Sequence, residues 1–177
     1  MVAVDGRGAS GKSVLAEYLG RLLPEFTALN GDDYFEPTPE GLAWGDFNEE
    51  RFRDDVITPL QRRVKSLRYR PYDWHADPPI TEREVEVGDG LILERCFSFA
   101  FDLDWDLKIW VETPREICLE RGIRRDLSFG DFPAARIKEV WIKVWAARED
   151  SYVRAKKPRE MADLILDGMR LFEEQLR

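Results

Sequence analysis

Near its start the chain carries Gly6-Arg7-Gly8-Ala9-Ser10-Gly11-Lys12-Ser13, which meets the spacing G-x-x-x-x-G-K-S in full. This spacing is the Walker A motif, a P-loop whose small residues let backbone N–H groups wrap a phosphate closely. We expect Lys12 to reach the β- and γ-phosphates of a nucleotide and the Ser13 hydroxyl to ligate Mg²⁺. The expected nucleotide-binding residues are Gly6, Gly8, Ala9, Ser10, Gly11, Lys12 and Ser13.

The sequence on either side of the loop has the context that this motif requires. An apolar run over residues 1–4 predicts a short buried strand, and apolar residues recur at helical spacing over 13–23. A helix that begins at the loop directs the positive end of its dipole at a bound phosphate. This context disfavours a chance match in a loop that binds nothing.

Farther along the chain, predicted strands alternate with predicted helices. The expected buried strands are 1–4, 26–29, 91–93, 107–111 and 162–166. The expected helices are 13–23, 48–65 and 133–152. A further helix is expected with Thr113 as its cap and Pro114 at its first position. A Pro- and Gly-rich loop is expected over 36–46 and an exposed strand over 81–87. This order favours an α/β fold, a P-loop NTPase three-layer sandwich with a mostly parallel sheet, helices on both faces and a short lid. The length of 177 residues fits one domain, residues 1–177.

The composition argues against several classes of protein. The formal net charge of −8 disfavours nucleic acid as a partner, because that binding needs Lys and Arg to neutralise phosphates. No apolar run approaches the roughly 20 residues that span a bilayer, and no signal peptide is recognised, so we expect a cytoplasmic protein with no membrane partner. Cys96 and Cys118 lack metal-site spacing and are interpreted as small core residues.

Carboxylates follow two of the predicted strands. Asp32 and Asp33 come after the second strand and Glu94 ends the third, at the strand ends where open α/β sheets bind ligands. Asp32 can accept the proton of an acceptor hydroxyl or orient that hydroxyl, and Glu94 can hold Mg²⁺ together with Ser13. Turn formation is the alternative for Asp32-Asp33. Since no Asn-Lys-x-Asp guanine-reading segment is present and motors or helicases are larger, a small-molecule kinase fits better than these classes.

The chain resembles the uridine kinase family, within the group that includes phosphoribulokinase, pantothenate kinase and nicotinamide riboside kinase. The matching segments follow the family's order over nearly the whole chain. They are 5–13 at the P-loop, 29–35 (LNGDDYF), 70–74 (RPYDW), 91–94 (LILE), Arg121 with Arg124-Arg125-Asp126, and Lys157-Pro158 with 162–165 (ADLI). Two positions depart from the family: Glu94 is followed by Arg95-Cys96 rather than Gly-Ile, and His75 is out of register with the uridine-reading histidine.

The resemblance implies a kinase that uses ATP and Mg²⁺. In the family's register Asp32 is the catalytic base and Tyr72 helps to hold the acceptor. Arg125 and Arg121 would clamp the transferring phosphoryl group from a lid at about residues 121–135. A solvated helix end, where cations suit the helix dipole, is the alternative for the arginines.

Aromatic side chains flank the predicted carboxylates and can sandwich a flat ring. The candidate substrate contacts are Asp33, Tyr34, Tyr72, Trp74 and His75. Core packing is the alternative for the aromatic residues, and plain exposure is the alternative for His75. Trp141 and Trp145 recur at helical spacing among aliphatic residues, so core packing is favoured there over a base-stacking platform.

Together these features favour an ATP-dependent phosphotransferase that acts on a hydroxyl of a nucleoside or nucleoside-like metabolite. Its partner would be that small-molecule acceptor, and the chain would be a monomer or a homo-oligomer. One alternative is a kinase of another small metabolite, such as a vitamin, sugar acid or antibiotic. The other is an ATP-binding module with weak hydrolysis, which would not need an acceptor base at Asp32.

Overall fold

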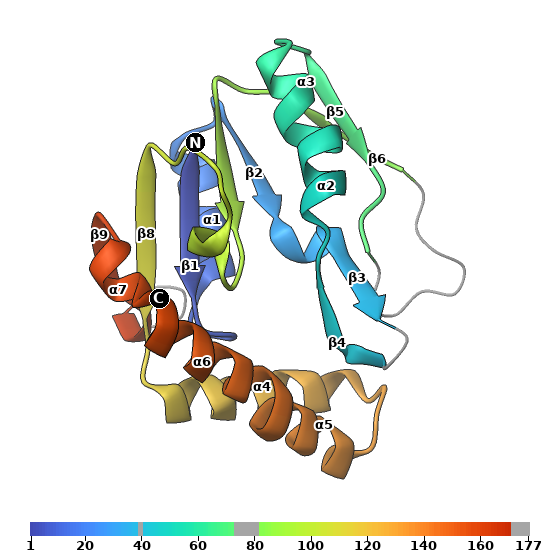
Figure 1. The fold of residues 1–177 in the computed structure, drawn as a ribbon, viewed down its shortest axis with the longest axis vertical. Coiled ribbons are helices and arrows are strands. Elements are labelled where there is room, and N and C mark those ends of the chain that lie inside the picture. The colour runs from blue at the N-terminus through green and yellow to red at the C-terminus, as the bar shows by residue number, and fades with distance from the viewer. Residues whose placement is uncertain (39–40, 73–81, 171–177) are drawn as a thin grey trace.

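A computed structural model describes residues 1–38, 41–72 and 82–170 of the chain. Its centre is a five-stranded sheet in the order β2-β7-β1-β8-β9, in which every neighbouring pair is parallel (Figure 1). The strands are β1 (Val2–Gly6), β2 (Phe26–Asn30), β7 (Gly90–Glu94), β8 (Leu107–Glu112) and β9 (Leu164–Asp167). The predicted parallel sheet is confirmed, and its strands correspond to the five apolar runs. The prediction that the last run is buried is wrong, because β9 is the edge strand and its Leu164 and Ile165 are exposed.

Helices cover both faces of this sheet, as predicted. On one face, α1 (Lys12–Leu22) places Leu15 and Ala16 against Val2, Val4 and neighbouring strand residues. The other face packs against the C-terminal helices α6 (Ala146–Lys156) and α7 (Pro158–Met161), and against a second helical segment. Because successive strand residues point to opposite faces, β1 uses Val2 and Val4 on the first face and Ala3 on the second.

The second helical segment is a continuous run of α2 (Glu49–Phe52), η2 (Arg53–Ile57) and α3 (Thr58–Gln61). Asn48 caps it as predicted, because its Oδ1 accepts a hydrogen bond from the backbone N–H of Arg51 at 2.8 Å. The run ends at Gln61, earlier than the predicted residue 65. The chain turns there through Arg63, whose φ of 56° lies in the left-handed region and cannot continue a helix.

Two antiparallel hairpins lie beside the sheet. β3 (Phe35–Thr38) pairs with β4 (Gly41–Phe47), so the prediction of a loop over 36–46 is wrong. β5 (Ser66–Tyr69) pairs with β6 (Arg83–Glu86), the strand expected within 81–87. β5 itself was not predicted, because Leu67 and Tyr69 form too short an alternating pattern to stand out.

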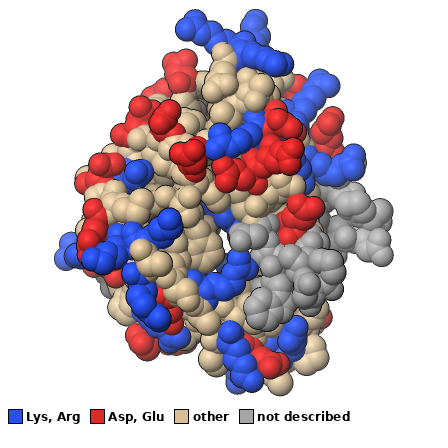
Figure 2. All heavy atoms as spheres, in the orientation of Figure 1, with Lys and Arg blue, Asp and Glu red and all other residues tan. Residues whose placement is uncertain are grey.

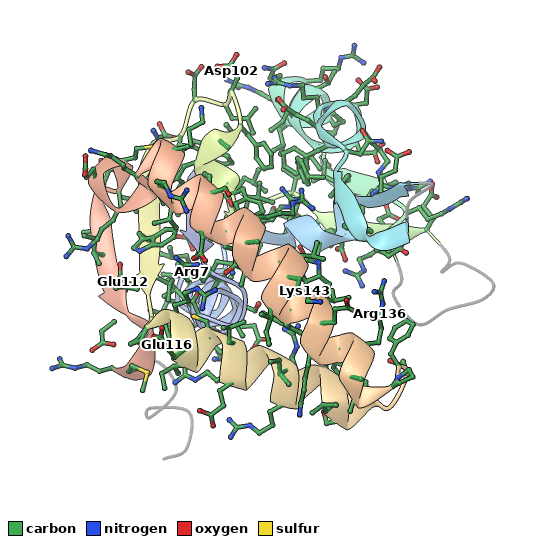
Figure 3. The ribbon with its side chains drawn as sticks, turned by 60° about the horizontal axis from the view of Figure 1, so that its bottom comes forward. Arg7, Asp102, Glu112, Glu116, Arg136 and Lys143 are labelled. Atoms are coloured by element: carbon green, nitrogen blue, oxygen red, sulfur yellow. The ribbon has the colours of Figure 1, made fainter. Side chains whose placement is uncertain are left out.

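Helices also cross the carboxyl ends of the strands. α4 (Arg115–Phe129) lies beside the continuous run of α5 (Ala134–Val140), η4 (Trp141–Trp145) and α6, which matches the predicted helix 133–152 (Figure 3). Thr113 was predicted to cap α4 with Pro114 at the first helical position, but Pro114 itself is the N-cap residue and α4 begins at Arg115. The Thr113 hydroxyl instead donates to the carbonyl oxygen of Ser10 at 2.8 Å, which ties the end of β8 to the P-loop. Within the three described ranges, no helix combines the length and apolar character needed to cross a membrane.

Candidate active site

A cavity of about 630 Å³ opens at the carboxyl ends of the strands, where α4, α5 and α6 face the P-loop. It is lined from both sides, by the ends of β2 and β7 and by residues of the crossing helices. Ten of the predicted site residues line it: Gly8, Ala9, Gly11, Lys12, Ser13, Asp32, Asp33, Tyr72, Glu94 and Arg125. The parallel sheet thus brings together residues that are distant in the sequence.

The P-loop has the open backbone that its sequence predicts. Gly11 adopts a φ of 110°, which favours glycine, and α1 begins directly after it. At Gly6 an added Cβ would lie 2.6 Å from the Ser10 Oγ and 2.8 Å from the Val111 carbonyl oxygen, so only glycine fits. The loop therefore keeps its backbone N–H groups accessible at the start of an eleven-residue helix.

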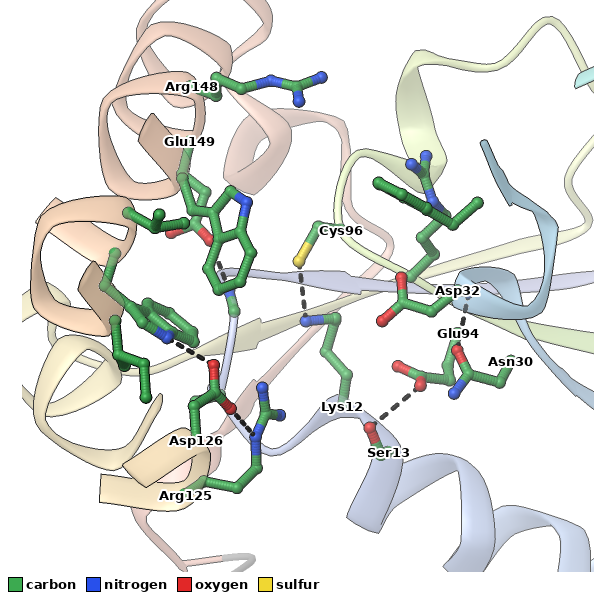
Figure 4. Close-up of a pocket in the computed structure, with 18 of the residues that line it drawn as sticks. Lys12, Ser13, Asn30, Asp32, Glu94, Cys96, Arg125, Asp126, Arg148 and Glu149 are labelled. Carbon is green, nitrogen blue, oxygen red and sulfur yellow. Dashed lines mark hydrogen bonds and ion pairs between the residues drawn. The ribbon is translucent and has the colours of Figure 1, made fainter. Parts of the chain in front are cut away.

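Lys12 is almost fully buried in this loop, and its Nζ donates to the Arg7 carbonyl oxygen at 2.8 Å and to the Cys96 Sγ at 3.3 Å (Figure 4). Burial lowers the pKa of Lys12, but Cys96, Glu94 and Glu149 together raise it above its ordinary value. Lys12 is therefore a permanent cation inside the cavity.

Ser13 and Glu94 meet at the floor of the cavity. The Ser13 hydroxyl donates to the Glu94 Oε1 at 3.0 Å, and Glu94 is buried (Figure 4). Burial raises the pKa of Glu94, while Lys12 lowers it in part. A hydroxyl next to a carboxylate supplies the oxygen ligands that Mg²⁺ takes in proteins, so this pair fits the predicted metal site.

The two neighbouring aspartates lie in different surroundings. Asp32 is exposed at the cavity wall beside Glu94 and Lys12, with its backbone N–H held by the Asn30 Oδ1 at 2.9 Å (Figure 4). The Asp33 Oδ2 instead accepts hydrogen bonds from the Tyr69 hydroxyl and from Arg83, both at 3.0 Å. Both aspartates line the cavity, but the Asp33 carboxylate is bonded to other side chains, whereas Asp32 is exposed.

The aromatic residues that were predicted to contact substrate also lie in different surroundings. Tyr34 has no exposed surface, and its ring packs against Phe47, Phe52 and Tyr69 in the core. The prediction that Tyr34 contacts substrate is therefore wrong, because it points to the opposite side from its neighbour Phe35. Phe35 and Tyr72 line the cavity with ring centroids 5.0 Å apart. Trp74 and His75 lie outside the described residues.

The predicted lid arginines point in different directions. Arg125 lines the cavity and donates to the Asp126 Oδ1 at 2.8 Å (Figure 4). Arg121 does not line it, and its guanidinium donates to the Gly168 carbonyl oxygen and the Met169 sulfur. The placement of Arg121 at a catalytic centre is therefore not supported. Arg124 is exposed beside Glu120.

Several cavity residues were missed or misread from the sequence. Glu149 is buried and its Oε1 accepts the N–H of Gly8 in the P-loop at 2.8 Å, across 141 positions of sequence. Cys96 lines the cavity beside Lys12, so its interpretation as a core residue is wrong. Trp141 is buried as predicted, yet it and Trp145 also form part of the cavity wall. No local pattern indicates these roles, because each depends on a long-range contact.

Asp5, the last residue before the P-loop, anchors the loop to the surrounding structure. Its fully buried carboxylate accepts hydrogen bonds from the backbone N–H groups of Gly6, Phe97 and Phe99 and from the Tyr152 hydroxyl. Burial raises the pKa of Asp5, and the hydrogen bonds from Tyr152, Phe99 and Gly6 oppose that rise. The carboxylate fixes the end of β1 against the segment that follows β7.

Replacing Asp5 by asparagine is expected to lower the free energy of unfolding by about 1–3 kcal/mol. An amide has one acceptor oxygen, so its NH₂ group would face buried donors such as the Phe99 N–H. Urea unfolding followed by circular dichroism measures the change, with the exposed Asp104→Asn as the control. Equal unfolding free energies for the two variants would show that Asp5 does not anchor the loop.

Known proteins with a similar sequence or fold include several kinases. No family model matches the chain. It is 24% identical to a uridine kinase of Borrelia hermsii over 183 residues, which covers 94% of this chain and 85% of the relative. A uridine kinase of Borreliella burgdorferi is 22% identical over 188 residues, with the same coverage.

Two solved structures share the fold. One is a possible uridine kinase from Bacillus stearothermophilus, with a TM-score of 0.68 and 18% identity over 94% of this chain and 87% of that chain. The other is a candidate fructose transport system kinase from a Silicibacter species, with a TM-score of 0.68 and 21% identity over 93% and 87% of the two chains. The resemblance drawn from the motifs is confirmed, and it extends over almost the whole chain.

Proposed function

This chain is related to the uridine kinase-like P-loop kinases, and on that premise we propose that it transfers the γ-phosphate of ATP to a hydroxyl of a nucleoside or nucleoside-like metabolite. The observation that carries the proposal is the meeting of three groups in one cavity. Lys12, the Ser13–Glu94 pair and Asp32 converge there from three separate segments (Figure 4). A nucleotide-binding module alone would need only the first two.

The donor half of the site would be the P-loop. Its backbone N–H groups and the Lys12 ammonium would hold the phosphates of ATP, and Ser13 with Glu94 would hold Mg²⁺. ATP supplies the phosphoryl group, and Mg²⁺ neutralises its charge. The Lys12 ammonium lies buried in the loop, and it would exchange its hydrogen bonds to Arg7 and Cys96 for the phosphates.

The acceptor half would be the wall formed by Asp32, Phe35 and Tyr72. The exposed Asp32 carboxylate would accept the proton of the acceptor hydroxyl, and the two rings would pack against the acceptor. Asp33 would support this wall through Tyr69 and Arg83 rather than contact the acceptor directly.

Arg125 would approach the transferring phosphoryl group from the helical side. Its Nε is held by Asp126, whose other carboxylate oxygen accepts from the Trp141 indole N–H at 2.7 Å. This chain of contacts aims the guanidinium into the cavity, where it would neutralise charge that develops during transfer. The turn between α4 and α5, within residues 121–135, would act as the lid that excludes water.

The direct test measures ATP consumption with Mg²⁺ across a panel of nucleosides, vitamins and sugars. We expect at least one acceptor to raise turnover well above the hydrolysis measured without acceptor, with a phosphorylated product visible by mass spectrometry. If no acceptor raises turnover, the kinase proposal fails and the hydrolytic module is favoured.

Replacing Glu94 by glutamine is expected to raise the Mg²⁺ concentration for half-maximal activity by about 10- to 100-fold. The amide keeps the hydrogen bond from Ser13 but removes the negative charge that would hold the metal. Titration of activity with Mg²⁺ at saturating ATP measures the change. The exposed Glu116→Gln serves as the control, and an unchanged Mg²⁺ requirement in the Glu94 variant would remove Glu94 from the metal site.

A further inference from the structure

A second hollow of about 510 Å³ lies beside the main cavity, between α6 and the segment that contains η3 (Ser98–Ala100). It shares three residues with the main cavity, Arg95, Phe97 and Arg148. The two hollows therefore adjoin, and a molecule whose hydroxyl lies near Asp32 has room to extend toward the second one.

The second hollow is lined by positive charge. Arg95, Lys143 and Arg148 are among its lining residues, and of the described residues that line it none is acidic. The whole chain has a formal net charge of −8, so this local excess of positive charge is opposite in sign to the net charge. Figure 2 shows one face of the molecule on which Lys and Arg side chains gather in places among Asp and Glu side chains. A recess lined by one sign of charge concentrates ligands of the opposite sign.

Arg95 connects the second hollow to the proposed acceptor site. It follows Glu94 directly, and only 7% of its surface is exposed. Its side chain lies against Gly31, where an added Cβ would come within 2.6 Å of it, and Gly31 precedes Asp32. The guanidinium stacks over the rings of Phe47 and Phe101, at 4.5 and 5.4 Å from their centroids. The charge is thus held rigidly between the proposed base and the second hollow.

Arg148 approaches the same region from the opposite side. It is half-buried on α6 and extends from that helix across the cavity (Figure 4). Two guanidinium groups on opposing walls suit an oxyanion, because planar guanidinium forks bind phosphate and carboxylate through paired hydrogen bonds. The aromatic rings of Phe97 and Phe101 lower the local dielectric constant and strengthen such bonds.

The position of Arg95 adds a second argument. Where the resembled family carries glycine after the glutamate of this strand, the chain carries a buried arginine. A buried guanidinium is costly to desolvate, and a glycine would impose no such cost. The arginine places a cation where the two hollows meet, and a glycine would place none there.

We propose that the phosphate acceptor carries an anionic group, phosphate or carboxylate, in addition to its reacting hydroxyl, and that Arg95 and Arg148 bind that group in the second hollow. This inference rests on the proposed kinase function and narrows its substrate class. The neutral nucleosides and sugars would then be poor acceptors compared with their phosphorylated or carboxylated counterparts.

Matched pairs of acceptors test the inference. The pairs are ribose and ribose 5-phosphate, uridine and uridine 5′-monophosphate, and glucose and glucuronate, each assayed with ATP and Mg²⁺. We expect kcat/KM for the anionic member of at least one pair to exceed that of the neutral member by about tenfold or more. The first two pairs test phosphate, and the third tests carboxylate.

Substitutions of Arg95 and Arg148 test whether these two residues bind the anionic group. Arg95→Met and Arg148→Gln are each expected to raise KM for the preferred anionic acceptor by about tenfold, while Arg95→Lys restores part of the loss. The ratio of kcat/KM for the anionic member to kcat/KM for the neutral member should therefore fall by about tenfold. The control is Arg124→Gln, since Arg124 is exposed on α4 and lines neither hollow. Calorimetric titration of the preferred anionic acceptor in the presence of ADP and Mg²⁺ gives a readout independent of turnover.

The outcomes separate this inference from the function on which it rests. If neutral acceptors are phosphorylated as well as their anionic counterparts, the inference is overturned and the kinase function stands. If Arg95→Met and Arg148→Gln reduce activity on both members of a pair equally, the arginines support the fold and the inference is again overturned. If no acceptor of any charge is phosphorylated, the proposed function itself fails.

Discussion

Replacing Lys12 by alanine is expected to reduce phosphotransfer by about 10³-fold while the fold stays intact. Lys12 is the lysine of the P-loop, and its pKa is raised by Cys96, Glu94 and Glu149, so it is charged at neutral pH. Its loss would also remove the charge that lowers the pKa values of Glu94 and Glu149. The lost ammonium leaves one positive charge fewer beside the phosphates, and the higher carboxylate pKa values would offset part of that change by favouring protonation.

Single-turnover assays with radiolabelled ATP measure the loss, and thermal unfolding monitors the fold. The control is Lys138→Ala, because Lys138 is an exposed lysine on α5 that lines neither hollow. Retained phosphotransfer in the Lys12 variant would show that the P-loop does not hold the donor. A variant that fails to fold would be recognised from its melting curve, and Lys12→Met, which keeps the apolar part of the side chain, would replace it.

The parallel sheet was predictable because its evidence is local. Runs such as 91–93 and 107–111 are short and mainly apolar, and the P-loop fixes the order of strand, loop and helix at the start of the chain. Their carboxyl ends necessarily share one edge of the sheet. For that reason Ser13 and Glu94 could be paired from the sequence, although 81 positions separate them.

The hairpin β3–β4 was not predictable by the same reasoning. Its segment contains Pro and Gly, which ordinarily indicate a loop, and its pairing depends on register between strands rather than on periodicity. The prediction of which of two neighbouring side chains lines the cavity failed for a related reason. Tyr34 and Phe35 are adjacent and aromatic, yet one faces the core and the other the cavity.

Arg121 and Arg125 show that sequence periodicity cannot distinguish the roles of two residues on one helix. They lie one helical turn apart on the same face of α4, so sequence periodicity treats them alike. Their surroundings differ, since Arg121 meets the chain after β9 at Gly168 and Arg125 meets Asp126 at the cavity. Such distinctions come from tertiary contacts that no local pattern contains.

Replacing Asp32 by asparagine is expected to lower kcat by about 10²- to 10⁴-fold with ATP affinity nearly unchanged. Asparagine has the same shape but cannot accept a proton from the acceptor hydroxyl at neutral pH. Asp32 belongs to η1 (Gly31–Tyr34) rather than to the P-loop, and the Asn30 cap on its backbone N–H remains in the variant. The change should therefore affect transfer without disturbing nucleotide binding.

Asp33 provides a matched control one residue away. Asp33→Asn would weaken the contacts with Arg83 and Tyr69, and Arg83 is half-exposed, so we expect a loss of only about 1 kcal/mol in unfolding free energy. Its kcat should stay within about threefold of the parent because its carboxylate is held by Tyr69 and Arg83. Rapid-quench kinetics report the transfer step, and titration with a fluorescent ATP analogue reports binding.

The pair of variants decides which aspartate is the base. The positions of the two carboxylates predict a large loss of kcat in Asp32→Asn and a small loss of stability in Asp33→Asn. The reverse pattern would mean that Asp33 leaves Arg83 and takes the proton itself. That exchange would require breaking two hydrogen bonds of 3.0 Å each, whereas the described contacts already leave Asp32 exposed beside Glu94 and Lys12. Asp32 is therefore the group that can act without rearrangement.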